Sequence, residues 1–131
     1  MKEKNSSPMK RILISEDEKI LALNYKKYLE AHGFYVEISS NANEALEKIH
    51  LGAQFDLIIT DLNMPKWDGS YIISGIYSQQ KNLKVIVVTG FADDSDYLKS
   101  ISEFPNVLAV LNKPVEFEEL LKIVKKALDI N

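Results

Sequence analysis

A chain of 131 residues has the size of one domain, and with 46% hydrophobic residues it can bury a core that needs no disulfide or structural metal. It contains no cysteine, which excludes thiol chemistry and cysteine-ligated zinc and fits a reducing compartment. Its net charge of −3 disfavours direct binding of nucleic acid, which needs a basic face to neutralise phosphates. No apolar run reaches membrane-spanning length and the polar start lacks the apolar centre of a secretory signal, so we expect no membrane contact and a cytoplasmic location.

Short apolar runs with the composition of strands alternate along the chain with segments of helical periodicity. In chain order, the expected elements are a strand at 11–15, a helix at 17–33, a strand at 34–39, a helix at 41–52, a strand at 55–60, a helix at 69–80, a strand at 84–89, a helix at 93–104, a strand at 106–111 and a helix at 116–129. Asn41, with Glu44 three residues later, has the pattern of a helix cap, and Gly33 has that of a helix end. We expect residues 1–9 to be a disordered lead and residues 10–131 to form the domain.

This alternation predicts a doubly wound α/β fold, in which a parallel sheet is covered by helices on both faces. The runs at 55–60 and 84–89 are apolar without alternation, which is typical of central strands that are buried on both faces. Gly75 and several β-branched residues weaken the helical pattern at 69–80. Ligands of open sheets of this kind bind outside the carboxyl ends of the strands, so these ends are the place to look for a site.

Polar side chains stand at the carboxyl ends of the expected strands. Glu16 and Asp17 follow the first strand, Asp61 follows the third, Thr89 ends the fourth and Lys113 follows the fifth. If the strand order is 2-1-3-4-5, the first and third strands are neighbours and these side chains share one edge. Crowded carboxylates favour a divalent cation between them, and oxygen ligands without His or Cys favour Mg²⁺. A lysine and a threonine nearby suit the oxygens of a phosphoryl group, which a carboxylate nucleophile can accept as an aspartyl phosphate.

The segments ILISEDE, DLNMPKWDG, VVTG and NKP, in this order and spacing, resemble the receiver domain of two-component response regulators. The resemblance extends from about Lys10 to Leu128. It implies a flavodoxin-like (βα)5 fold of the chemotaxis-regulator type, with five parallel strands in the order 2-1-3-4-5. It also implies that Asp61 is the phosphoacceptor, which takes a phosphoryl group in a Mg²⁺-dependent reaction from the phosphohistidine of a histidine kinase or a histidine phosphotransfer protein.

By the same resemblance, Asp17 and Asp61 are direct ligands of Mg²⁺, and the main-chain carbonyl of Asn63 is a third. Glu16 takes the place of the outer acidic residue, which acts through a metal-bound water. These assignments make Mg²⁺ the expected cofactor.

Thr89 corresponds to the switch hydroxyl that moves towards the phosphate, and Lys113 to the lysine that pairs with it, with a cis bond to Pro114. The sequence departs from the family at Val110, three residues before the lysine, where many receivers carry a tyrosine or phenylalanine that swings inward on activation. Two alternatives follow: signalling depends on Thr89 and backbone shifts of the loop after it, or the signalling surface behaves differently. Phe91, in this loop, is a candidate to compensate for the missing aromatic residue or to shield the phosphate.

The implied function is a signalling module that supports its own phosphorylation and dephosphorylation and is not an enzyme in its own right. Phosphorylation changes the face formed by the fourth helix, the fifth strand and the last helix, which then binds a downstream protein, or Asp61 passes the phosphoryl group onward in a phosphorelay. The implied state is a monomer or a phosphorylation-dependent dimer.

Two other functions compete with this one. A small Mg²⁺-dependent phosphatase with Asp61 as nucleophile needs a general acid two residues later, where Asn63 stands. A flavodoxin-like FMN binder needs a Ser/Thr/Gly phosphate loop after the first strand, which is missing. His32 and His50 lie near expected helix C-termini, where a cationic ring is favourable, so we interpret both as surface residues and not as phosphohistidines.

Overall fold

The computed structural model describes residues 9–62, 69–80, 82–90 and 95–130. Its strands are β1 (Arg11–Ser15), β2 (Tyr35–Ser39), β3 (Leu57–Asp61), β4 (Lys84–Thr89) and β5 (Val107–Asn112). Its helices are α1 (Lys19–Ala31), α2 (Ala42–His50), α3 (Gly69–Gln79), α4 (Ser95–Ser102) and α5 (Phe117–Ala127). The ten expected elements are confirmed, with helices that begin or end up to two residues inside the expected limits. Within the described residues, no helix is both long enough and apolar enough to cross a bilayer.

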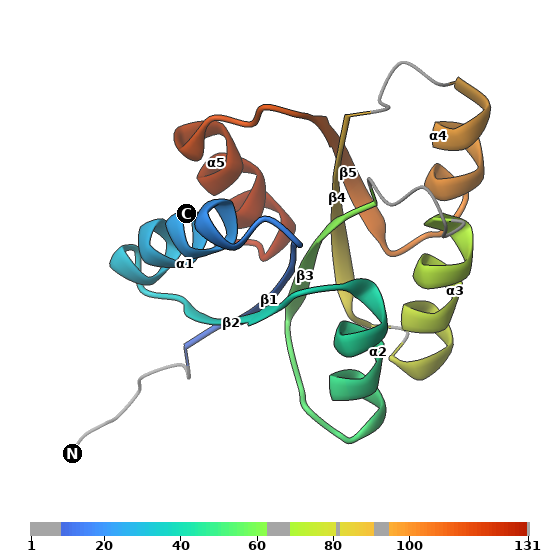
Figure 1. The fold of residues 1–131 in the computed structure, drawn as a ribbon, viewed down its shortest axis with the longest axis horizontal. Helices are drawn as coiled ribbons and strands as arrows, with labels where there is room; N and C mark the ends of the chain where they lie inside the picture. Colours follow the sequence, from blue (N-terminus) through green and yellow to red (C-terminus); the bar gives the residue numbers. More distant parts are fainter. Residues whose placement is uncertain (1–8, 63–68, 81, 91–94, 131) are drawn as a thin grey trace.

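All strand pairs are parallel, and the sheet has the order β2-β1-β3-β4-β5, as the resemblance implies. Helices α1 and α5 cover one face of the sheet, and α2, α3 and α4 cover the other (Figure 1). On the first face, Ile14 and Ile59 belong to the same buried hydrophobic cluster as Leu120 of α5. On the second face, Leu13 and Ile58 belong to the same buried cluster as Ile73 of α3. β1, β3 and β4 therefore lie inside the sheet with apolar cover on both sides, which is why their sequences are apolar without alternation.

Local sequence signals explain where the helices begin and end. Asn41 caps α2, because its side-chain oxygen accepts a hydrogen bond of 2.8 Å from the main-chain N of Glu44. The Glu44 carboxylate reaches back and accepts a hydrogen bond of 3.2 Å from the main-chain N of Ser40. Gly33 and Gly52 follow α1 and α2 with φ angles of 94° and 98°, a conformation that favours glycine and ends a helix.

Gly75 lies in the middle of α3, where sequence alone suggests only a weakened helix. The structure shows a packing role, because α2 and α3 are neighbours and a Cβ atom at position 75 would lie 3.2 Å from Cδ2 of Leu46. The glycine thus costs some helix propensity but allows a close approach of the two helices.

Candidate functional site

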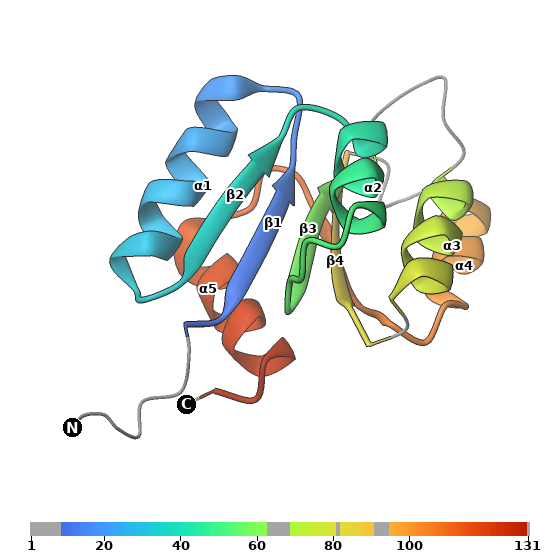
Figure 2. The same ribbon diagram turned by 90° about the horizontal axis from the view of Figure 1, so that it is seen from below.

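Five polar residues of the sequence prediction lie at the carboxyl edge of the sheet, the edge to which the arrows of β1 and β2 point in Figure 2. Glu16 and Asp17 follow β1, Asp61 ends β3, Thr89 ends β4 and Lys113 follows β5. β1 and β3 are paired directly, with Ser15 opposite Thr60, so the acids that follow these residues are neighbours in space. The edge is thus formed by residues that lie far apart along the chain.

Glu16, Asp17 and Asp61 form a carboxylate cluster, in which one oxygen atom from each residue lies within 4.8 Å of the others. Glu16 and Asp61 are buried, whereas Asp17 is exposed and leaves the cluster open to solvent. An all-oxygen set with one open side suits a hard divalent cation such as Mg²⁺, which keeps several of its waters. Asn63, the fourth expected ligand, lies outside the described residues.

Lys113 is the cation that faces these acids. Its Nζ lies 2.7 Å from Oδ2 of Asp61 and 3.2 Å from Oε1 of Glu16. Burial lowers the pKa of Lys113, but the hydrogen bond to Asp61 and the charges of Asp61 and Glu16 outweigh this effect and raise the pKa above its usual value. Lys113 therefore carries a full positive charge at any physiological pH.

The pKa of Glu16 is shifted upwards, whereas that of a carboxylate paired with a cation is usually lowered. Burial, assisted by the negative charge of Asp61, raises its pKa to about 7, although the main-chain N of Glu18 donates a hydrogen bond of 3.1 Å to its Oε2. The single positive charge of Lys113 thus does not neutralise the negative charges of the carboxylates at this edge. The remaining negative charge is what a divalent cation would compensate.

Thr89 is fully buried at the end of β4. Its main-chain oxygen accepts a hydrogen bond of 3.0 Å from the main-chain N of Lys113, which precedes the cis bond to Pro114. The backbone of Thr89 and that of Lys113 are therefore held next to each other at the ends of β4 and β5.

Val110, the position of the family's aromatic residue, is half-buried in β5. It pairs with Val87 of β4, which in turn pairs with Thr60 of β3, and it packs against the core beneath α2, α3 and α4. A short branched side chain in this row belongs to the packed core. Phe91, the candidate to compensate for it, lies outside the described residues.

Glu18 was not assigned a role from the sequence. In the structure its Oε2 lies 3.7 Å from Nζ of Lys113, so a third acid contacts the lysine. The run Glu16-Asp17-Glu18 was a signal for this, because a glutamate at a helix start is too long to cap its own helix. His32 and His50 are exposed, as expected, and Nδ1 of His32 lies 2.9 Å from the main-chain oxygen of Tyr28 in its own helix.

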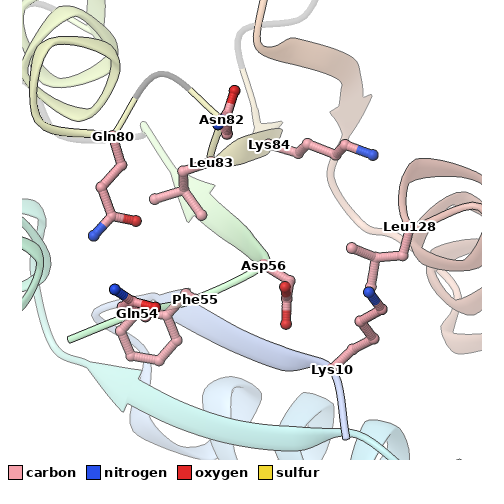
Figure 3. Close-up of a pocket in the computed structure, with 9 residues that line it drawn as sticks. All are labelled: Lys10, Gln54, Phe55, Asp56, Gln80, Asn82, Leu83, Lys84 and Leu128. Atoms are coloured by element: carbon pink, nitrogen blue, oxygen red, sulfur yellow. The ribbon is translucent and has the colours of Figure 1, made fainter. Parts of the chain in front are cut away.

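The opposite, amino edge of the sheet holds an open pocket of about 440 Å³ (Figure 3). Its charged side chains include Asp56 and Lys84, and both already have partners. Asp56 accepts a hydrogen bond of 2.8 Å from the main-chain N of Arg11, and Nζ of Lys84 donates one of 2.8 Å to the oxygen of Ala127. The pocket is far from the carboxylate cluster along the strands and shares none of its residues.

Comparison with known proteins agrees with this geometry. The model of the response regulator receiver domain family matches residues 12–125, and the chain therefore belongs to the receiver domains of two-component response regulators. It is 32% identical to the response regulator receiver protein CpdR of Brucella abortus, in an alignment that covers 92% of this chain and 98% of CpdR. It is 28% identical to part of the sensor kinase CckA of the same organism, with 90% of this chain but 12% of that kinase covered.

Solved structures show the same fold. A CheY-like receiver domain protein from Methanospirillum hungatei superposes with a TM-score of 0.80 at 32% identity, covering 92% of this chain and 94% of the other. The response regulator TrrA of Thermotoga maritima, solved in complex with Mg²⁺-BeF, superposes with a TM-score of 0.76 at 30% identity, covering 92% of this chain and 100% of the other. The flavodoxin-like, doubly wound architecture is thus confirmed.

Proposed function

We propose that this receiver domain accepts a phosphoryl group on Asp61 from a phosphohistidine donor, in a reaction that needs Mg²⁺. The observation that carries the proposal is the contact of Asp61 with Lys113 at 2.7 Å beside the carboxylates of Glu16 and Asp17. A nucleophile, a cation for phosphate oxygens and an oxygen set for a metal then share one edge. The similar response regulator TrrA was solved in complex with Mg²⁺-BeF, which supports Mg²⁺ as the cofactor.

In the proposed reaction, a carboxylate oxygen of Asp61 attacks the phosphorus atom, a phosphorus–oxygen bond forms and the phosphorus–nitrogen bond breaks. The electron pair of the broken bond stays on the histidine nitrogen. Lys113 and the hydroxyl of Thr89 stabilise the phosphoryl oxygens, because both groups donate hydrogen bonds and the lysine adds charge. Glu16, Asp17 and Asp61, with the carbonyl of Asn63, would hold Mg²⁺, which neutralises the charge of the transferring group.

The test is incubation with acetyl phosphate or phosphoramidate and Mg²⁺, followed by intact mass. We expect one phosphoryl group that is stable in acid and labile in base, and we expect Asp61→Asn to abolish it. Asp56→Asn is a matched control, because Asp56 lies directly before β3 at the amino edge, whereas Asp61 ends β3 at the carboxyl edge. A phosphoryl group that persists in Asp61→Asn, or none on the wild type, would overturn the proposal.

We further propose that the chain works in the cytoplasm as a signalling module and not as an enzyme with its own substrate. Its donor is a histidine kinase or a histidine phosphotransfer protein, which fits the occurrence of a similar domain within the sensor kinase CckA. Its output is either the face formed by α4, β5 and α5 or onward transfer of the phosphoryl group. Rapid turnover of a generic phosphate ester would favour the phosphatase alternative instead.

A further inference from the structure

Glu18 occupies the N-cap position of α1 with extended backbone angles, φ −81° and ψ 104°, and its side chain makes no capping hydrogen bond. Short side chains such as Ser, Thr, Asp and Asn reach the amides of the first helical turn from this position, and glutamate is not among the preferred capping residues. The carboxylate of Glu18 is therefore not committed to its own helix.

This carboxylate points instead towards Lys113. The main-chain N of Glu18 is fixed by its hydrogen bond to Oε2 of Glu16, and Oε2 of Glu18 lies 3.7 Å from Nζ of Lys113. The side chain of Glu18 is 68% exposed, whereas that of Lys113 is 16% exposed. Lys113 thus has two buried acid partners, Asp61 and Glu16, and one exposed acid partner on the solvent side.

We propose that Glu18 is a positioning residue that acts through Lys113 and slows the entry of anionic phosphoryl donors, an inference that rests on the phosphoacceptor function of Asp61. In the unphosphorylated chain, Glu18 shares the ammonium group that the incoming phosphoryl oxygens require. Its negative charge also stands at the open side of the site and repels the donor. Removal of this charge leaves Lys113 with one acid partner fewer on its solvent side and weakens the repulsion of the donor, so phosphorylation becomes faster.

The expected size of the effect follows from the exposure of Glu18. An exposed ion pair near 4 Å contributes little, which corresponds to a rate increase of roughly twofold to fivefold at low ionic strength. Salt screens exposed charges, with a Debye length of about 3 Å at 1 M, so the increase should vanish at high salt. The effect should also be larger for a donor of higher negative charge.

The experiment compares wild type, Glu18→Gln, Glu18→Asp and Glu116→Gln. Glu116 is the matched control, because it is an exposed glutamate at the N-cap of α5 that also makes no side-chain capping bond. Initial rates of phosphorylation are measured by intact mass at saturating Mg²⁺, with dianionic acetyl phosphate and with monoanionic phosphoramidate, at low and at high salt. Saturating Mg²⁺ separates the effect on the donor from an effect on metal affinity.

We expect Glu18→Gln to be phosphorylated faster by acetyl phosphate, by less with phosphoramidate, and at the wild-type rate in high salt. Glu18→Asp, which keeps the charge, should lie nearer to wild type, and Glu116→Gln should match it. Equal rates for Glu18→Gln and wild type, or an increase that salt does not reduce, would overturn the role of Glu18 alone. A wild type that takes no phosphoryl group would overturn the proposed function itself.

Discussion

The two edges of the sheet differ in how their charged side chains are arranged. At the amino edge, the guanidinium of Arg11 lies 3.3 Å from the Glu37 carboxylate, donates a hydrogen bond of 2.8 Å to the oxygen of Gln54 and stacks 4.1 Å from the ring centre of Tyr35. At the carboxyl edge, the carboxylates of Glu16, Asp17 and Asp61 gather around Lys113.

The difference separates a structural network from a reactive site. Arg11 pairs with Glu37, and Glu37 also lies 3.3 Å from Nζ of Lys48, so each of these charges has a partner of opposite sign. The carboxyl edge gathers more carboxylates than cations, and burial, assisted by the charge of Asp61, raises the pKa of Glu16 there. Such an edge is costly for the metal-free fold, which is what a site built for the proposed divalent cation would show.

Lys113→Met should have the largest effect on the stability of the metal-free protein. It removes the cation from two buried carboxylates, and breaking such a pair costs about 3 kcal/mol of unfolding free energy. The measurement is urea unfolding in the presence of a chelator, with Lys84→Met at the exposed amino edge as the control. A metal-free Lys113→Met as stable as wild type would show that the carboxyl edge is not strained by its charge.

The metal-free protein should also lose stability as pH rises. The pKa of Glu16 is raised by burial to about 7 in the folded state, so its contribution is fully favourable below about 4.5 and is lost as pH passes through 7. The full loss is on the order of 3 kcal/mol, since the pKa rises from 4.5 to about 7 and one pKa unit corresponds to about 1.4 kcal/mol. The measurement is the unfolding free energy between pH 5 and pH 8 in the presence of a chelator. Its dependence on pH should be less steep in Glu16→Gln than in wild type, and an unchanged slope would contradict this assignment.

Asp17→Asn should weaken Mg²⁺ binding at the carboxyl edge. The loss of a carboxylate from an oxygen site is expected to lower affinity by tenfold or more, on the order of the effect of removing supporting groups from metal sites. Trp67, six residues after Asp61 in the sequence, provides a fluorescence signal for the titration. Asp56→Asn is the control, and a titration that is flat in wild type would count against the metal site.

Arg11→Met should have the smallest effect. The guanidinium is half-exposed, so its ion pair is screened by water and its removal should cost about 1 kcal/mol, part of it from lost packing on Tyr35. The stabilisation of the protein by Mg²⁺ should not change. A changed Mg²⁺ response in thermal unfolding would show that the two edges are coupled.

Most of the fold could be predicted because its signals are local and repeated. Strands buried on both faces, such as β3 and β4, are continuous apolar runs, and the cap at Asn41 and the turn at Gly33 depend on neighbours in the sequence. The gathering of Glu16, Asp61 and Lys113 followed from one rule of parallel sheets, that carboxyl ends lie at one edge.

What could not be predicted depends on side-chain reach and helix spacing. Glu18 is one of many exposed acids in the sequence, and only the backbone of the helix start directs it towards Lys113. Gly75 counts against a helix until the distance to Leu46 is known. The raised pKa of Glu16 also depends on its burial, and a position between a strand and a helix in the sequence does not show whether a glutamate is buried.

The hydrogen bond from the main-chain N of Lys113 to the oxygen of Thr89 has a mechanical consequence. It joins Thr89 and Lys113 through the backbone, so a displacement of Thr89 is transmitted directly to Lys113. β5 lies at the outer margin of the sheet and pairs with β4 there, so it can follow such a displacement without rearranging the inner strands. Under the proposed phosphorylation of Asp61, a chain with valine at position 110 would thus have a backbone route from the site to its outermost strand.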